Sequence, residues 1–240
     1  MTSPLNHEQT VGFFEEHDYF GLNRDQVDFY VQGTLPLLNE EGKVFFDFPG
    51  HVAEAPDGNG HSLHAFYESG IWQKWFDNGI RFLNFINVDN PLSDPHDLKL
   101  VSFHHKQGND VTMKCIPRED PKEKVGVVVS WEGTPCIVEY TEMGTEEMEA
   151  YNADGSFKHS CANIGNFCFG MDFIQKLVER EDFPFHLAHK SVKVNGEQPD
   201  VPNAWKFEWF IFDVWNKEDK VGLLVYPREE CFEPLKGIDS

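Results

Sequence analysis

The sequence is poor in basic residues. Its 240 residues include 20 Lys and Arg against 41 Asp and Glu, which gives a formal net charge of −21 and an isoelectric point near 4.8. Nucleic acids and anionic membranes would be repelled by such a chain, so neither is expected as a partner. A small anionic ligand is not excluded, because a few placed lysines, backbone N–H groups and a divalent ion are enough to hold a nucleotide.

Several other patterns are missing. The five cysteines are odd in number and form no Cys-x-x-Cys pair, which favours reduced thiols over a disulfide framework. The sequence has no run of about 18 apolar residues and no N-terminal targeting segment, so a soluble protein of the cytoplasm is expected. A Gly-x-Ser-x-Gly elbow is absent too, and nucleophilic hydrolase chemistry is not expected.

What the chain does contain is an alternation of strand and helix patterns. Its length fits one large domain or two small ones. A second N-terminal helix that carries residues 27–31 is expected after a cap at Asn23, and Asp94-Pro-His-Asp97 is expected to start a later helix. The alternation indicates an α/β sheet flanked by helices. Strands are predicted at residues 43–48, 81–88, 111–117, 125–130, 136–140, 164–169 and 221–226, and helices at 10–16, 62–77 with a break at Gly70, 171–180 and 204–216.

A glycine-rich turn follows the first predicted strand. Asp57, Gly58, Asn59 and Gly60 stand in succession after a proline. Glycine has no Cβ, so a ligand can lie against the backbone there, and the amide of Asn59 can both donate and accept hydrogen bonds. An ordinary surface turn is an equally weighted interpretation.

Acidic side chains at strand ends are the next candidates. Asp89 ends the strand predicted at 81–88, where open α/β sheets bind ligands, and its carboxylate is a natural ligand for Mg²⁺ or Mn²⁺. The alternative is a cap on the turn with Asn90. Glu139 ends another strand and can accept hydrogen bonds from sugar hydroxyls, or it is a solvated charge. Asp213 is a possible second acidic group, although a structural role is favoured for it.

Lysines and histidines are the basic candidates. Lys206 and Lys236 are the cations expected near phosphates, although isolated lysines are most often solvated surface charges. The pairs His61-x-x-His64 and His186-x-x-His189 have no third ligand at suitable spacing, so a zinc site is not expected.

The short motifs of the chain also form an ordered set. In their order and spacing they resemble the eukaryotic-type UDP-N-acetylhexosamine pyrophosphorylase family of uridylyltransferases, and the resemblance covers nearly the whole chain. The motifs are the turn at residues 52–60, Asn87-Val-Asp-Asn90, Val125-Gly-Val-Val128, Val138-Glu-Tyr-Thr-Glu142, Ala162-Asn-Ile-Gly-Asn166, Lys206-Phe-Glu-Trp-Phe-Ile-Phe-Asp213 and Phe232-Glu-Pro-Leu-Lys236.

The resemblance implies a fold and an activity. The fold is a Rossmann-like (GT-A-like) nucleotidyltransferase with a mixed sheet, and residues 1–240 would form the central part of its catalytic domain, incomplete at both termini. The activity is formation of a UDP-sugar and pyrophosphate from UTP and a sugar 1-phosphate. N-acetylglucosamine 1-phosphate is the favoured substrate, and glucose 1-phosphate or a broader range is the alternative.

The resemblance also implies roles for individual residues. Asp89 would hold Mg²⁺ or Mn²⁺, and Gln32 and the backbone at Gly58 would read uracil. Lys206 and Lys236 would act on the phosphates, and His186 would line the cleft. The residues implied to contact the sugar are Asn59, Gly126, Glu139, Asn163 and Phe212.

The chain departs from the family in one large respect. It lacks the loop Leu-x-x-Gly-x-Gly-Thr-x-x-Gly, followed by Pro-Lys, with which members wrap the triphosphate. A UDP-sugar-binding module without catalysis is therefore the second hypothesis, and a purely structural domain is the third. Open sheet edges left by the missing strand would invite self-association or a separate N-terminal segment. Around the pocket Glu54, His61 and Phe167 differ from the usual family residues and leave the sugar undecided.

Overall fold

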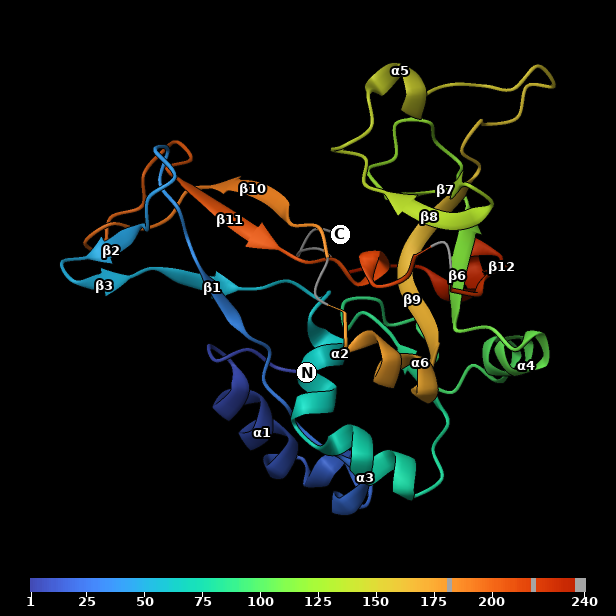
Figure 1. The fold of residues 1–240 in the computed structure, drawn as a ribbon, viewed down its shortest axis with the longest axis horizontal. Helices are drawn as coiled ribbons and strands as arrows, with labels where there is room; N and C mark the ends of the chain where they lie inside the picture. Colours follow the sequence, from blue (N-terminus) through green and yellow to red (C-terminus); the bar gives the residue numbers. More distant parts are fainter. Residues whose placement is uncertain (181–182, 217–218, 236–240) are drawn as a thin grey trace. The chain divides into compact units, whose positions relative to one another are not determined.

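The computed structural model describes residues 1–180, 183–216 and 219–235 (Figure 1). Within it the chain divides into two compact units, and each unit is built from two separate stretches of sequence. Unit 1 comprises Met1–Asn78 and Leu177–Val214, and unit 2 comprises Gly79–Lys176 and Trp215–Ser240. Lys236 lies outside the described residues.

Unit 2 is built on a six-stranded mixed sheet with the order β12-β6-β9-β7-β8, in which β5 also pairs with β9. β12 runs parallel to β6, and the other pairings are antiparallel. β5, β6 and β7 all pair with β9, which makes β9 the strand around which this sheet is organised (Figure 1). The strands are β5 (Phe82–Phe85), β6 (Val111–Pro117), β7 (Val127–Trp131), β8 (Thr134–Val138), β9 (Cys161–Gly170) and β12 (Val221–Val225).

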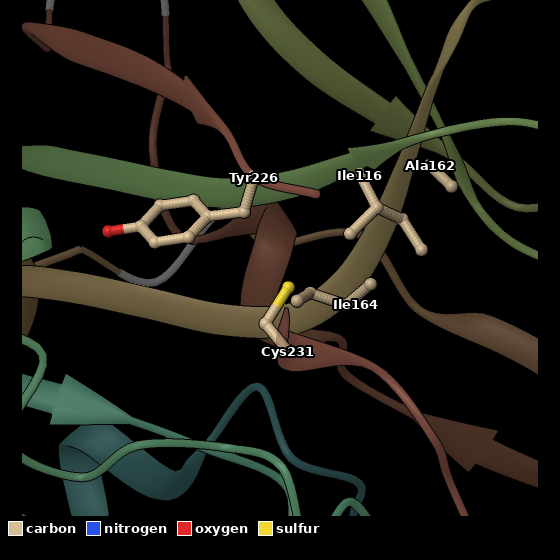
Figure 2. Packing of buried hydrophobic residues seen from close by; sticks show 5 residues of the cluster. All are labelled: Ile116, Ala162, Ile164, Tyr226 and Cys231. Atoms are coloured by element: carbon tan, nitrogen blue, oxygen red, sulfur yellow. The ribbon is translucent and has the colours of Figure 1, made fainter. Parts of the chain in front are cut away.

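Burial explains why these segments are strands. Residues 111–116 of β6 are all buried, which matches a strand covered on both faces. One core cluster of the sheet consists of Ile116, Ala162, Ile164, Tyr226 and Cys231. Figure 2 shows Ile164 and Cys231 side by side in this cluster, with Ile116 next to Ala162. The cluster packs the segment after β12 onto the middle of the sheet.

Four helices belong wholly or mainly to unit 2: α4 (Leu98–Gln107), α5 (Thr145–Met148), α6 (Met171–Leu177) and α7 (Arg228–Cys231). The helix start expected at Asp94-Pro-His-Asp97 is confirmed at Asp97, although the helix does not include Asp94 or the proline. Asp94 instead accepts a hydrogen bond from His96 N (2.8 Å) in a local turn, and Asp97 caps α4 by accepting from Leu100 N (2.9 Å). α4 ends at Gly108, which adopts a left-handed conformation with φ 61°.

Unit 1 combines small antiparallel pairs with short helices. β1 pairs with β4, β2 with β3, and β10 with β11. A small core of Leu37, Phe45, Ala53 and Ala204 holds the strands together. The elements are α1 (His7–Glu16), η1 (Asp18–Gly21), η2 (Arg24–Gln26), β1 (Thr34–Pro36), β2 (Phe46–Phe48), β3 (His51–Val52), β4 (Glu54–Pro56), α2 (Ser62–Glu68), α3 (Ile71–Asp77), β10 (His186–Lys190), β11 (Ala204–Glu208) and η3 (Ile211–Asp213).

Several sequence predictions for unit 1 can be compared with these elements. The helix expected at residues 62–77 is confirmed as α2 and α3, with the break at Gly70, which has φ 78°. The capping box at Asn23 is present, but it begins only the 3₁₀ turn η2. The expected helix through residues 27–31 is wrong, because that stretch is extended and Thr2 forms a parallel bridge with Val31.

The helix expected at residues 204–216 is also wrong. Residues 204–208 form β11, a strand paired with β10, and the 3₁₀ turn η3 follows. Trp205 and Phe207 alternate with Lys206 and Glu208, which is the period of two that a strand requires. The many aromatic residues of the segment favoured a helix prediction over this strand period.

The structure also bears on the cysteines and on membrane-spanning helices. The cysteines Cys115, Cys136, Cys161, Cys168 and Cys231 are free thiols. Among the described residues, no helix combines the length and the apolar character needed to cross a bilayer.

Candidate functional site

The glycine turn of unit 1 packs against a distant segment of the same unit. Gly60 N donates to Trp209 O (2.8 Å), and Trp209 N donates to Asp57 O (2.8 Å). Gly58 has φ +90°, and a Cβ there would overlap the backbone of Trp209, whose N atom would be 2.9 Å away. The protein's own backbone therefore fills the space beside Gly58 that a side chain would take, and a ligand against the rest of the turn stays a prediction.

The turn nevertheless gathers the predicted nucleotide residues. Gln32 Nε2 donates to Asp57 Oδ1 and to Gly58 O, each at 3.3 Å. Asn59 Oδ1 accepts from Ile211 N (2.9 Å), which ties the tip of the turn to η3. The structure thus brings Gln32, Gly58 and Asn59 together, although the sequence separates Gln32 from the turn by a hairpin.

The predicted residues near β11 have partners within unit 1. Lys206 Nζ lies 2.7 Å from Glu208 Oε1, and both side chains are about four-fifths buried (19% and 23% exposed). Phe212 is 8% exposed and lies edge-on to His186, so it has the burial of a core residue. Asp213 Oδ2 lies 2.7 Å from His186 Nε2, a contact that fits the structural role favoured for Asp213.

Three of the predicted sugar residues converge on the sheet of unit 2. A Cβ on Gly126 would lie 2.8 Å from Glu139 Oε1, so the carboxylate rests directly against the glycine. Gly126 O accepts from Asn163 N (2.8 Å), and Asn163 Oδ1 accepts from Gly165 N (2.9 Å). Gly126 must remain glycine for the carboxylate to hold this position. Glu139 and Asn163 are both partly exposed, so polar groups can reach them from outside.

The loop that carries Asp89 lies along the same strand. A Cβ at Gly165, which has φ +71°, would collide with the side-chain amide of Asn87, two residues before Asp89. Ser93 Oγ accepts from Asn166 Nδ2 (3.1 Å) at the other end of the loop. The metal-binding candidate and the sugar-binding candidates therefore neighbour one another along the middle of β9.

Asn90 is a residue whose importance the sequence did not reveal. It is 4% exposed, and its Nδ2 donates to Cys231 O (2.8 Å) while its Oδ1 accepts from Glu233 N (3.1 Å). Asp89 O also accepts from Leu235 N (2.8 Å). The Asp89 loop is thereby bonded to the segment 231–235, the last described part of the chain. The sequence motif contains Asn90 but gives no signal for its contacts with residues 231 and 233.

A buried ion pair lies at the start of α4, which follows this loop in the sequence. Lys114 Nζ lies 2.7 Å from Asp97 Oδ2, and Tyr226 donates its hydroxyl to Asp97 Oδ1 (2.9 Å). Burial opposes the ionised form of Asp97, but the hydrogen bonds from Lys114, Leu100 and Tyr226 prevail and hold its pKa below the usual value. Burial, followed by the hydrogen bond to Asp97, raises the pKa of Tyr226. The carboxylate thus fixes the start of α4 on β6.

Comparison with known proteins identifies the family. The model of the UTP–glucose-1-phosphate uridylyltransferase family matches residues 1–239. This chain belongs to that family. UDP-N-acetylglucosamine pyrophosphorylase of Saccharomyces cerevisiae is 35% identical over 248 residues, covering 99% of this chain and 52% of the relative. UDP-N-acetylglucosamine diphosphorylase 2 of Arabidopsis thaliana is 34% identical, covering 100% of this chain and 48% of the relative.

The fold comparison agrees with the family. The crystal structure of the uridine diphosphate N-acetylglucosamine pyrophosphorylase from Trypanosoma brucei, solved with an inhibitor, matches with a TM-score of 0.87 at 27% identity. The match covers 98% of this uridylyltransferase-family chain and 49% of the other chain. The mixed α/β nucleotidyltransferase fold is therefore confirmed, and the chain spans about half the length of the curated relatives it matches.

Proposed function

We propose that this chain supplies the uracil- and sugar-binding part of a UDP-N-acetylglucosamine pyrophosphorylase. The reaction joins UTP and N-acetylglucosamine 1-phosphate to give UDP-N-acetylglucosamine and pyrophosphate. Family membership supports the uridylyl transfer, and relatives at about 35% identity that carry this name support the sugar. The observation that carries the proposal is the convergence of Gly126, Glu139 and Asn163 beside the Asp89 loop.

The sugar contacts follow from the chemistry of these side chains. The Glu139 carboxylate accepts hydrogen bonds from two vicinal hydroxyls. The side-chain amide of Asn163 has its oxygen engaged by Gly165 N, so its nitrogen is the group to donate to an acetamido carbonyl or a ring hydroxyl. Gly126 keeps a sugar close to the sheet because it has no side chain. Asn59 and Phe212 belong to unit 1, and a sugar contact for them rests on the family resemblance alone.

Asp89 is the proposed metal ligand. No group of three His, Cys, Asp or Glu side chains able to hold an ion occurs among residues 1–180, 183–216 and 219–235. A single carboxylate fits Mg²⁺ or Mn²⁺, since Mg²⁺ prefers one or two carboxylates with phosphate oxygens and water. When bound, the ion would neutralise charge on the phosphates of UTP.

The remaining chemistry is positioning. An oxygen of the sugar phosphate attacks the α-phosphorus of UTP, the bond to the β-phosphate bridging oxygen breaks, and pyrophosphate leaves, with no covalent intermediate on the protein. The work of the chain is to hold the two substrates in line and to place positive charge near the phosphates. Lys206 and Lys236 are the proposed cations.

Calorimetry with UDP-N-acetylglucosamine, UDP-glucose and UMP tests the proposal. Glu139→Gln should weaken binding of UDP-N-acetylglucosamine by about 1–3 kcal/mol, the cost of a charged hydrogen bond, and leave UMP affinity unchanged. Glu146→Gln, at an exposed position of α5, is the matched control. Tighter binding of UDP-glucose by the parent chain would move the proposal to the glucose substrate. Failure to bind any of the three ligands would overturn it.

A turnover assay separates the enzyme from the binding module. The parent chain is incubated with UTP, N-acetylglucosamine 1-phosphate and Mg²⁺, and release of pyrophosphate is followed. Release that depends on Asp89 and Glu139 supports the uridylyltransferase. Tight UDP-sugar binding without release supports a binding role for these 240 residues alone.

A further inference from the structure

The carboxylate of Asp57 lies under the residue proposed to read the base. It is 2% exposed, and its two oxygens have different donors. Oδ1 accepts from Gln32 Nε2 (3.3 Å), and Oδ2 lies 3.1 Å from His61 Nδ1. A Cβ at Gly33 would come within 2.6 Å of Oδ2. The carboxylate therefore occupies a fixed position between the chain at Gly33 and the start of α2.

The backbone of Asp57 is held as firmly as its side chain. Asp57 N donates to Gly33 O (3.2 Å), and Asp57 O accepts from Trp209 N (2.8 Å). Neither the residue nor its carboxylate can rotate away without breaking these bonds. Asp57 Oδ1 is therefore a hydrogen-bond acceptor held at a fixed position in front of Gln32.

The partners of Gln32 decide which end of its amide points inward. A carboxylate oxygen of Asp57 and the carbonyl of Gly58 both accept hydrogen bonds and cannot donate them. Only the Nε2 group can face them, since the reverse orientation would set Oε1 against two acceptors. Oε1 is consequently the end of the amide left to meet a ligand, and it can only accept.

An acceptor at this place distinguishes the pyrimidine bases. Uracil carries a hydrogen on N3, whereas N3 of cytosine is a bare lone pair. Oε1 of Gln32 can accept from uracil N3–H but would oppose cytosine N3. The inference rests on the proposed function, because it assumes that Gln32 contacts the base.

The geometry points to Asp57 as the positioning residue that makes the nucleotide site specific for uridine. Asp57 acts through Gln32: it fixes the amide so that an oxygen, and not a nitrogen, is offered to the N3 edge of the base. The substrate class selected in this way is the uridine nucleotides, and the class rejected is the cytidine nucleotides.

Nucleotide titrations of variants test this assignment. The affinities of UMP, CMP and N3-methyl-UMP are measured by calorimetry for the parent chain and for Asp57→Asn. In the parent, UMP should bind at least about tenfold more tightly than the other two. In Asp57→Asn, the new amide can present a donor to Gln32, so the reversed Gln32 amide gains one partner and is opposed by Gly58 O alone. The ratio of UMP to CMP affinity should then fall several-fold toward one.

A matched control is built into the same unit. Asp47 also pairs with a histidine four residues later, His51, at 2.6 Å, but it has no contact with Gln32. Asp47→Asn should leave the UMP to CMP ratio unchanged. A purely structural role for Asp57 would weaken both nucleotides alike and preserve the ratio, so the ratio separates positioning from misfolding.

Each outcome is decisive. A preserved ratio in Asp57→Asn, with UMP still bound by the parent, would overturn the role of Asp57 and leave the proposed function standing. Should Asp57→Asn fail to fold, the parent still decides the matter, because equal binding of UMP and N3-methyl-UMP would show that no acceptor meets N3. Absence of binding of all uridine compounds by the parent would overturn the proposed function and this inference together.

Discussion

His104 makes the stability of unit 2 depend on pH. The imidazole is 1% exposed, its Nδ1 lies 3.0 Å from Thr112 Oγ1, and its Nε2 has no hydrogen-bond partner in the part of the chain that the structure describes. Burial lowers the pKa of His104 to about 4 from an ordinary value of 6.5. Protonation would place a charge and an unpaired N–H between α4 and β6, where no water can solvate them.

The sign of the effect follows from proton binding. The unfolded chain takes up a proton on this residue below pH 6.5, whereas the folded chain does so only near pH 4. The contribution of His104 is therefore fully present above pH 6.5 and is lost as the pH falls from 6.5 toward 4. Each pH unit in that window removes up to about 1.36 kcal/mol, which amounts to roughly 2 kcal/mol between pH 6.5 and 5.

Urea unfolding at pH 7.5 and 5.0 measures this loss. The parent should lose roughly 2 kcal/mol more between the two pH values than His104→Gln, which cannot titrate. His96→Gln, at an exposed position before α4, is the control and should lose as much as the parent. An equal loss in the parent and in His104→Gln would refute the reasoning, and so would an NMR titration that placed the pKa of His104 near 6.5.

Two further predictions concern the metal and the glycine turn. Asp89→Asn should abolish the part of UTP affinity that depends on Mg²⁺ and leave UMP affinity unchanged, as measured by calorimetry with and without the ion; an unaltered Mg²⁺ dependence would remove Asp89 from the metal site. Gly58→Ala should lower the free energy of unfolding by more than the roughly 1–2 kcal/mol that a left-handed alanine costs, because its Cβ would also overlap Trp209. Gly42→Ala has similar strain (φ +74°) with open space around it, so equal losses in the two variants would contradict the packing described for the turn.

The strands and helices with strong local signals were predictable. Val111 to Ile116 form an unbroken buried run, and the paired helices around Gly70 have their break where glycine stands. β11 was missed because the alternation of Trp205 and Phe207 with polar residues is only a few residues long and runs directly into the aromatic residues 209–212. Periodicity decides poorly between helix and strand at that length.

The residue types of the candidate site could be predicted from the sequence, but the tertiary contacts of these residues could not. The motifs singled out Gly58, Asn59 and Glu139, and local sequence explained why each could bind. That Trp209 fills the space beside Gly58, or that Asn90 bonds the segment 231–235, depends on contacts between residues more than 100 positions apart. No local pattern encodes such contacts.

The division of the chain into two units that each draw on separate stretches has a consequence for synthesis. β6 is complete once residue 117 has been made, but its parallel partner β12 ends at residue 225. Likewise β10 and β11 of unit 1 follow the whole of residues 79–176, which belong to unit 2. The pairs of unit 1 are local in sequence, but the sheet of unit 2 can be completed on the ribosome only after residue 225 has emerged. Until then the edge of β6 that pairs with β12 has no strand beside it, and an unpaired strand edge can pair with another chain.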